Sequence, residues 1–400
     1  MGERGMTGHA RGTARLDWVD ATRGYSVAAV VLFHVILWSY APAIADLDGV
    51  EVPFWGTVNS ILGSVRMPVL LAVSGLVMAR RIRTGPLVHG TLAKAAANYY
   101  LYVVWLLVYA AFYAVVTQAY LPHRVDGPVE VLAQLVVPAT TLWYLLALAV
   151  YTVLLTLVRR VPAWVVLTVL TVLSTLVHGQ SFPDQLWNKV PELFVFFAFG
   201  VYGATVLRRL AERAHAVWLV AAAVVAVGVT GLGRFTHGRA ADALVFVPRG
   251  LAFMVLMVLA VVLAVRWAPV RRLGVALGRQ TLAVYVLHPL WIALLTVLVV
   301  GPLRPALRAL LANPAGAALY PLVVTALLIA LSLPVRALAG RVHLGWLFAL
   351  PTAWSDALSG ARRPTSSRET ASEARPTGTM QAPNAARLNG PVAASGGELP

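Results

Sequence analysis

The chain has 400 residues, of which 59% are hydrophobic and only 12% are Asp, Glu, Lys or Arg. A typical soluble domain has about 25% charged residues, so this composition excludes a soluble enzyme, a coiled coil and a disordered protein. It predicts an all-α polytopic membrane helix bundle. The net charge of +16 comes from short basic clusters between apolar runs, which is typical of topology signals and not of nucleic-acid binding.

A helix needs about 20 apolar residues to cross the hydrocarbon core. Ten runs bounded by charge, Pro or Gly are predicted to do so, at about 24–41, 57–79, 97–117, 141–158, 162–178, 191–207, 215–233, 244–265, 279–300 and 318–335. The shorter run 129–137 is predicted to lie at the membrane interface. The first 23 residues have no apolar core or cleavage-site pattern, so we expect no cleaved signal peptide.

The basic residues predict the orientation of these ten spans. If the N-terminus is cytoplasmic, the cytoplasmic segments carry 24 Lys and Arg residues and the external segments only six. This bias favours cytoplasmic N- and C-termini. Residues 1–354 are then an integral-membrane domain, and residues 355–400, which lack aromatic residues and are rich in Ser, Ala, Pro, Gly and Arg, are predicted to be a disordered cytoplasmic tail.

Ionisable residues inside a bilayer are costly, and they therefore mark candidate functional positions. His34 lies about 15 Å into the first span, and Arg23 stands at the cytoplasmic end of the same helical stripe. Asp20 is placed to cap the start of this span. Arg23 is alternatively a simple anchor, and His34 a neutral residue that is hydrogen-bonded within the bundle.

Arg66 lies in the second span, about 21 Å from its cytoplasmic end and close to the depth of His34. No Asp or Glu lies deep in any predicted span, so Arg66 is expected to face an anion, a carbonyl or a polar cavity shared with His34. Ser74 and Gly75 follow towards the cytoplasm, where they either serve the site or pack helices closely.

Each of the remaining candidate residues has a functional and a structural explanation. Tyr285 and His288 in the ninth span form part of a site or satisfy each other in the bundle. Trp143 opens the fourth span, where an interfacial aromatic belt is the default explanation. Arg249 either lines an acceptor site or reaches outward, and Glu192 has the same alternatives, although its place favours stabilising the start of the sixth span.

Four segments in order resemble the acyltransferase-3 family of integral-membrane O-acyltransferases. LDWVDATRGYSVAAVVLFHV (16–35) has the Arg-x10-His spacing of the family's first span and an Asp at the family's position, although Ala21-Thr22 replace Gly-Leu. RMPVLLAVSGLVMARR (66–81) is similar to its second-span motif, without the aromatic residues. LWYLLAL (142–148) and GRQTLAVYVLHPL (278–290) are similar to its Trp-Tyr-Leu and Tyr-x-x-His elements, with Thr281 in place of Ser.

The resemblance implies transfer of an acyl group, acetyl or another short chain, from cytoplasmic acyl-CoA to a hydroxyl of a carbohydrate, envelope glycan or glycosylated natural product. Acyl-CoA is then a co-substrate, with no permanent cofactor and no metal, in a bacterial plasma membrane. Arg23 and the basic cluster in 80–94 would hold phosphates, His34 would act as base or as covalent nucleophile, and Arg66 would stabilise an oxyanion. The matched motifs place the substrate near Asp20, Ser74, Trp143, Tyr285 and His288.

Two other classes of function remain. A transporter or flippase for a glycan or lipid-linked precursor could use the same Arg and His residues, although the chain shows no internal repeat and no deep carboxylate. A non-catalytic scaffold would not need an Arg and a His at matching depth.

Overall fold

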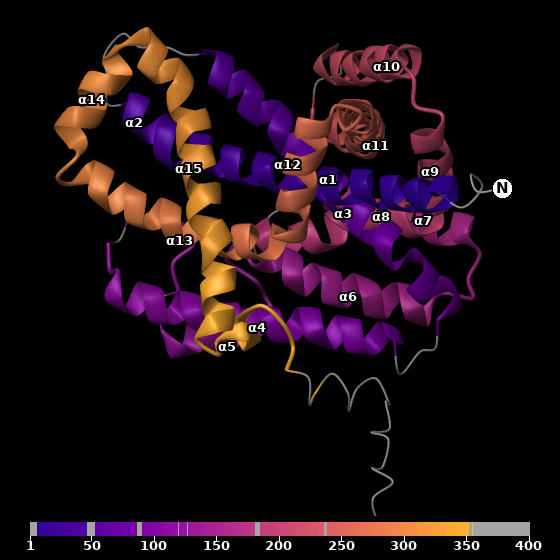
Figure 1. The fold of residues 1–400 in the computed structure, drawn as a ribbon, viewed down its shortest axis with the longest axis horizontal. Helices are drawn as coiled ribbons and strands as arrows, with labels where there is room; N and C mark the ends of the chain where they lie inside the picture. Colours follow the sequence, from indigo (N-terminus) through magenta and orange to yellow (C-terminus); the bar gives the residue numbers. More distant parts are fainter. Residues whose placement is uncertain are drawn as a thin grey trace, which may run out of the picture. The chain divides into compact units, whose positions relative to one another are not determined.

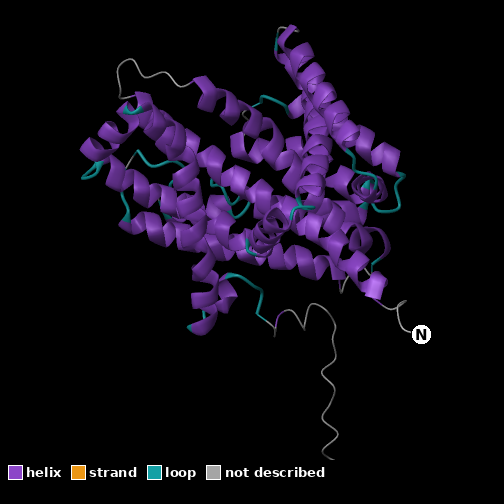
Figure 2. Cartoon of the chain, turned by 45° about the horizontal axis from the view of Figure 1, so that its top comes forward, coloured by secondary structure: helices purple, strands orange, loops and turns teal. Residues whose placement is uncertain are grey.

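The computed structural model describes residues 6–45, 53–85, 90–118, 120–125, 127–180, 185–235, 238–351 and 354. These residues form helices and loops, with no strand (Figure 2). The predicted all-α class is therefore confirmed. Contacts within the chain group residues 1–360 in one unit and 361–400 in another. The predicted disordered tail at 355–400 lies outside the described residues.

The elements follow one another along the chain as shown in Figure 1. They are α1 (Met6–Val35), η1 (Ile36–Tyr40), α2 (Ala41–Ala45), α3 (Pro53–Thr84), α4 (Leu92–Val115), α5 (Pro128–Gln134), α6 (Trp143–Leu157), α7 (Ala163–Val177), α8 (Gln185–Tyr202), α9 (Ala204–Glu212), α10 (Ala216–Phe235), α11 (Arg239–Ala264), α12 (Ala268–Arg279), α13 (Thr281–Val300), α14 (Arg304–Ala312), α15 (Pro314–Arg341) and η3 (Gly345–Leu347).

Each of the ten predicted spans corresponds to a helix in this order. Seven helices among the described residues are long and apolar enough to cross a membrane, and the bent pair α8 and α9 makes an eighth candidate. α6 and α7 are apolar but have only 15 residues each. The run 129–137 forms the short helix α5, which has seven residues. The count of ten spans and their orientation stay predictions.

Two helix boundaries differ from the sequence-based expectation. A continuous span over 191–207 is wrong, because the chain bends by 66° between α8 and α9 at Gly203. After this bend, Arg208, Arg209 and Glu212 give α9 a polar face that is costly to bury in hydrocarbon. Asp20 does not cap the first span, because α1 begins at Met6 and Asp20 lies in its interior. The preceding residues contain no proline and include the good helix formers Ala, Arg and Leu.

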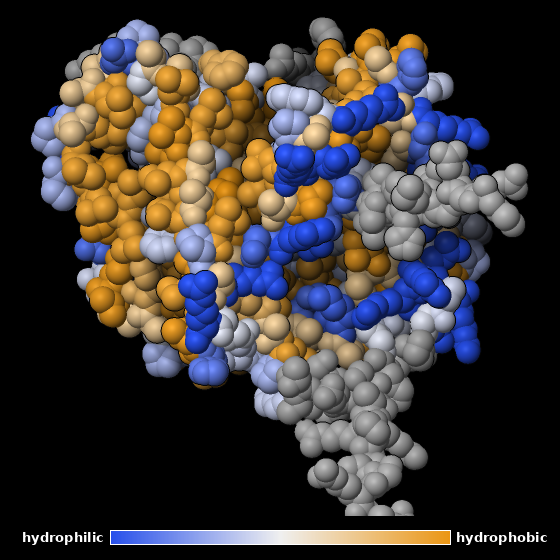
Figure 3. Space-filling model, in the orientation of Figure 1, coloured by the Kyte–Doolittle hydropathy of each residue, from blue (hydrophilic) through white to orange (hydrophobic). Residues whose placement is uncertain are grey.

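α1 and α3 contact each other at the centre of the arrangement. α8 packs on α3, while α12, α13 and α15 pack on α1. α4 pairs with α6, and α10 pairs with α11 (Figure 1). On the face drawn in Figure 3, hydrophobic residues cover much of α13, α14 and α15. Leu298, Leu310, Leu319 and Val323 are among the exposed side chains of these helices, as expected where lipid is the solvent.

Glycines make the closest helix crossings. A Cβ atom at Gly200 of α8 would lie 1.9 Å from the Ala72 carbonyl oxygen of α3, and one at Gly75 would lie 2.1 Å from the Phe197 carbonyl oxygen. Of the two readings of the Ser74-Gly75 pair, the close packing of helices therefore holds for Gly75. On the other side of α1, a Cβ at Gly278 would lie 2.0 Å from the Asp20 carbonyl oxygen, which fixes α1 against the end of α12.

Candidate active site

The two intramembrane histidines of α1 and α13 meet. His34 Nδ1 lies 3.0 Å from His288 Nε2, and the two rings meet edge to edge with centroids 5.1 Å apart and planes 22° apart. His288 is completely buried, and its Nδ1 lies 3.1 Å from the Val284 carbonyl oxygen. A carbonyl oxygen only accepts hydrogen bonds, so Nδ1 of His288 carries a proton and donates it there.

This chain of contacts fixes the tautomer of His34. Neutral His288 has an acceptor at Nε2, and His34 Nδ1 must therefore be the donor in the contact between the two rings. A neutral His34 then has its lone pair on Nε2. The arrangement is that of an imidazole base oriented by a second group through its other nitrogen.

Arg66 of α3 contacts Phe33, and Phe33 in turn contacts His34. Its guanidinium carbon is 3.4 Å from the Phe33 ring centroid, and the Phe33 and His34 rings are in edge contact at 5.3 Å. Arg66 Nη1 donates to the Leu62 carbonyl at 3.1 Å, and its buried Nε has no hydrogen-bond partner among the described residues. In the same part of the chain no ion pair joins a carboxylate to Arg66.

A cavity of about 220 Å³ opens between α1, α3, α4, α6, α8 and α13. Its polar lining residues are Arg23, Ser74, Lys94, Asn98, Tyr144, Thr152, Thr281 and Tyr285. Arg23 donates from Nη2 to the Thr281 hydroxyl at 3.3 Å. The Ser74 hydroxyl donates to the Leu70 carbonyl and accepts from the Tyr144 hydroxyl, each at 2.8 Å. Three of the predicted site residues, Arg23, Ser74 and Tyr285, thus share one cavity.

The histidine pair lies beyond this cavity along two helices. Val27 lines the cavity, and His34 lies about 10 Å further along α1 on nearly the same stripe. On α13, the ring of the lining residue Tyr285 is 6.1 Å from that of His288. His34 and Arg66 do not line the cavity itself. Arg66 instead lies over the Phe33 ring and donates to the Leu62 carbonyl, which is one of the partners expected for it, and a polar cavity shared by Arg66 and His34 stays a prediction.

Trp143 and Asp20 stand apart from the cavity lining. Trp143 is buried at the start of α6, where its ring contacts Tyr144 at 6.4 Å, so an exposed aromatic belt position is wrong for it. Asp20 contributes its backbone to the close crossing with Gly278. The assignment of Trp143 and Asp20 to the substrate site stays a prediction.

Sequence reasoning missed two residues that contact His34 directly or through one ring. Trp38 stacks on His34 with centroids 4.2 Å apart, and its spacing of four residues on the same helix could have indicated it. His123 lies in the loop between α4 and α5, and its ring centroid is 5.2 Å from that of Trp38. No helical register relates this loop to α1, so no sequence signal pointed to His123.

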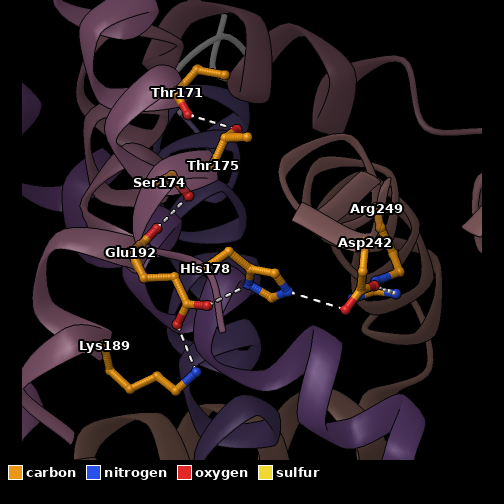
Figure 4. A network of polar contacts seen from close by, with 8 residues as sticks. All are labelled: Thr171, Ser174, Thr175, His178, Lys189, Glu192, Asp242 and Arg249. Carbon is orange, nitrogen blue, oxygen red and sulfur yellow. Dashed lines mark hydrogen bonds and ion pairs between the residues drawn. The ribbon is translucent and has the colours of Figure 1, made fainter. Parts of the chain in front are cut away.

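Glu192 and Arg249 belong to a second polar network (Figure 4). Glu192 is buried inside α8, 2.6 Å from both His178 Nδ1 and Lys189 Nζ. Its expected role at a helix start is wrong, because α8 begins seven residues earlier, at Gln185. His178 Nε2 lies 3.3 Å from Asp242, which accepts from Arg249 at 3.4 Å. This network joins α8, the end of α7 and α11, and none of its members lines the Arg23 cavity.

The family model described as an acyltransferase domain matches residues 16–337. The chain belongs to the acyltransferase-3 family. This multi-pass membrane acyltransferase is similar to the inner membrane protein YcfT of Escherichia coli (strain K12), with 22% identity over 361 residues, which cover 84% of this chain and 96% of that relative. No solved structure matches the chain.

Proposed function

We propose that this acyltransferase is an acyl-CoA-dependent O-acyltransferase of a bacterial plasma membrane, which moves an acetyl or other short acyl group to a hydroxyl of a carbohydrate, envelope glycan or glycosylated acceptor. The observation that carries the proposal is the His34–His288 pair, whose tautomer leaves a lone pair on His34 Nε2. The pair lies beyond the cavity that Arg23 and Lys94 line, further along α1 and α13 from the lining residues Val27 and Tyr285.

Arg23 and Lys94 are suited to bind the acyl donor, acyl-CoA. Both line the cavity, and both lie near the predicted cytoplasmic ends of their membrane spans. The phosphates of coenzyme A are strong acceptors for guanidinium and ammonium donors. With the phosphates held there, the flexible pantetheine arm extends along the cavity, and the thioester reaches the depth of His34, about 15 Å inward from the start of the span.

In the direct route, the acceptor hydroxyl gives its proton to His34 Nε2 while its oxygen attacks the thioester carbon. The tetrahedral intermediate collapses with cleavage of the carbon–sulfur bond. The coenzyme A thiolate leaves and takes up the proton from His34, so the products are the ester and free coenzyme A. The same lone pair would serve a two-step route through an acyl-imidazole, which ping-pong kinetics would reveal.

Arg66 supports the charge that develops on the thioester oxygen. Its Nε–H is buried and has no hydrogen-bond partner in the described part of the chain, so this donor is available to an oxyanion at no cost to another contact there. A preorganised donor in a site of low dielectric constant stabilises the intermediate more than the ground state. The ring of Phe33 holds the guanidinium in place next to His34.

The test is transfer of label from radiolabelled acetyl-CoA to a panel of glycosides and extracted envelope glycans, by the purified protein in nanodiscs. We expect turnover by the wild type, and a loss of roughly 10²–10⁴-fold in His34→Ala, with acetyl-CoA still bound. Near wild-type kcat in the folded His34→Ala variant would contradict the catalytic role. Translocation of a glycan without ester formation would favour a transporter instead.

A further inference from the structure

The helix that carries His34 changes its winding directly after it. Ile36–Tyr40 form the π-helical turn η1, in which the Ala41 amide donates to the Ile36 carbonyl. Such turns are rare and occur mostly at functional sites. This one is fixed from α15, because the buried Ser39 hydroxyl lies 2.7 Å from the Tyr320 hydroxyl. The π-helical turn is therefore stabilised by a tertiary contact with α15.

Trp38 lies in the middle of η1 and stacks on His34. The indole and imidazole planes are 17° apart, with centroids at 4.2 Å. The His288 ring meets the edge of His34, with the two planes 22° apart. A ring held on one face by Trp38 and at Nδ1 by His288 has little freedom to rotate.

His123 fixes Trp38 from outside α1. Its ring contacts Trp38 edge to face at an angle of 64°, and its Nδ1–H donates to the Ala139 carbonyl at 3.0 Å. The backbone of His123 has φ +54°, a left-handed conformation that glycine adopts without a steric cost. Glycine would adopt this backbone conformation with less strain than histidine. The contacts with Trp38 and Ala139, however, require the histidine side chain.

We propose that Trp38 and His123 are positioning residues for His34. His123, bonded to Ala139, holds Trp38, and Trp38 restricts the imidazole so that Nδ1 stays on His288 and Nε2 stays turned to the reacting hydroxyl. This inference rests on the proposed role of His34 as base or nucleophile. A shift of about 1 Å at a reacting group can cost a hundredfold in rate, so the loss of either ring should lower kcat.

The decisive variant is His123→Gly, which removes the ring and suits the backbone. We expect kcat to fall roughly ten- to a hundredfold, with the KM for acetyl-CoA unchanged, because the Arg23 end of the cavity is untouched. His343 supplies the matched control. It is exposed, and it is the other non-glycine residue with positive φ (60°) in the described part of the chain. His343→Gly should keep the wild-type kcat.

A second pair of variants separates stacking from simple filling of space. Trp38→Phe keeps an aromatic face on His34 and should retain most of kcat, whereas Trp38→Leu should lose roughly as much as His123→Gly. If Trp38→Leu does not fold, His123→Gly and His123→Asn carry the test, since asparagine tolerates the left-handed conformation.

Wild-type kcat in His123→Gly, an equal loss in His343→Gly, or a raised KM with unchanged kcat would overturn the inference. His34→Ala is measured alongside these variants. If His34→Ala is inactive and His123→Gly is fully active, only the positioning role fails. If His34→Ala is active, the proposed function of His34 fails, and the positioning role fails with it.

Discussion

His34 and His288 are 254 residues apart in the chain, yet Nδ1 of the first lies 3.0 Å from Nε2 of the second. Because His288 Nδ1 is committed to the Val284 carbonyl, this contact determines which nitrogen of His34 can take a proton. We expect His288→Ala to lower kcat about a hundredfold, because His34 loses the partner that sets its orientation. His288→Gln keeps an acceptor for the Nδ1–H and should recover part of the rate. Steady-state kinetics with acetyl-CoA check this, and equal activities of both variants and the wild type would contradict it.

Arg23→Ala should chiefly raise the KM for acetyl-CoA, because phosphate binding is shared by the ground and transition states. The kcat at saturating donor should change little. Arg160→Ala is the control, since Arg160 is exposed and basic but does not line the cavity. A fall in kcat with an unchanged KM would remove Arg23 from the donor site.

Arg66→Lys should fail to restore activity, because a compact ammonium cannot present the planar set of donors of a guanidinium. The loss should be equal in kcat and kcat/KM, at roughly 10²–10³-fold, as when one oxyanion donor is removed. The rate must be normalised to the monodisperse fraction extracted in detergent. If the normalised kcat equals that of the wild type, Arg66 has only a structural role.

Gly200→Ala should destabilise the crossing of α3 and α8, because the added Cβ would meet the Ala72 carbonyl at 1.9 Å. An overpacked contact of this kind costs roughly 1–3 kcal/mol, and thermal unfolding in detergent would report it as a lower Tm. Gly228→Ala on α10 is the matched control, since a Cβ there has no neighbour within 4 Å. Helix propensity should make that variant neutral or slightly stabilising.

The orientation of the chain is tested by reporter fusions at Asp48 and Arg368. The 24-to-6 distribution of basic residues predicts that Asp48 is external and Arg368 cytoplasmic. The two reporters should therefore read opposite sides of the membrane. Both reporting the same side would exclude the ten-span arrangement.

The sequence by itself determined the helical class, the order of the apolar helices and the family. These follow from local information, because hydropathy over about 20 residues decides what can lie in lipid, and the motifs around His34, Arg66 and His288 are continuous in the chain. The free-energy cost of burying an ionisable side chain in the bilayer marks the same residues as candidates from the sequence alone. Helix ends do not follow from the sequence in the same way, because the start of α1 before Asp20 and the bend at Gly203 depend on weak local preferences that packing can override.

Only the tertiary structure decided how these residues meet. The tautomer of His34 depends on a partner from α13, the guanidinium of Arg66 lies on Phe33 and not in the cavity, and Glu192 pairs with His178 across two helices. His123 reaches Trp38 from a loop whose backbone conformation no helical period encodes. Contacts of this kind depend on how the helices cross. At the closest crossings, the approach of two helices depends on glycines whose partners lie far away in the sequence.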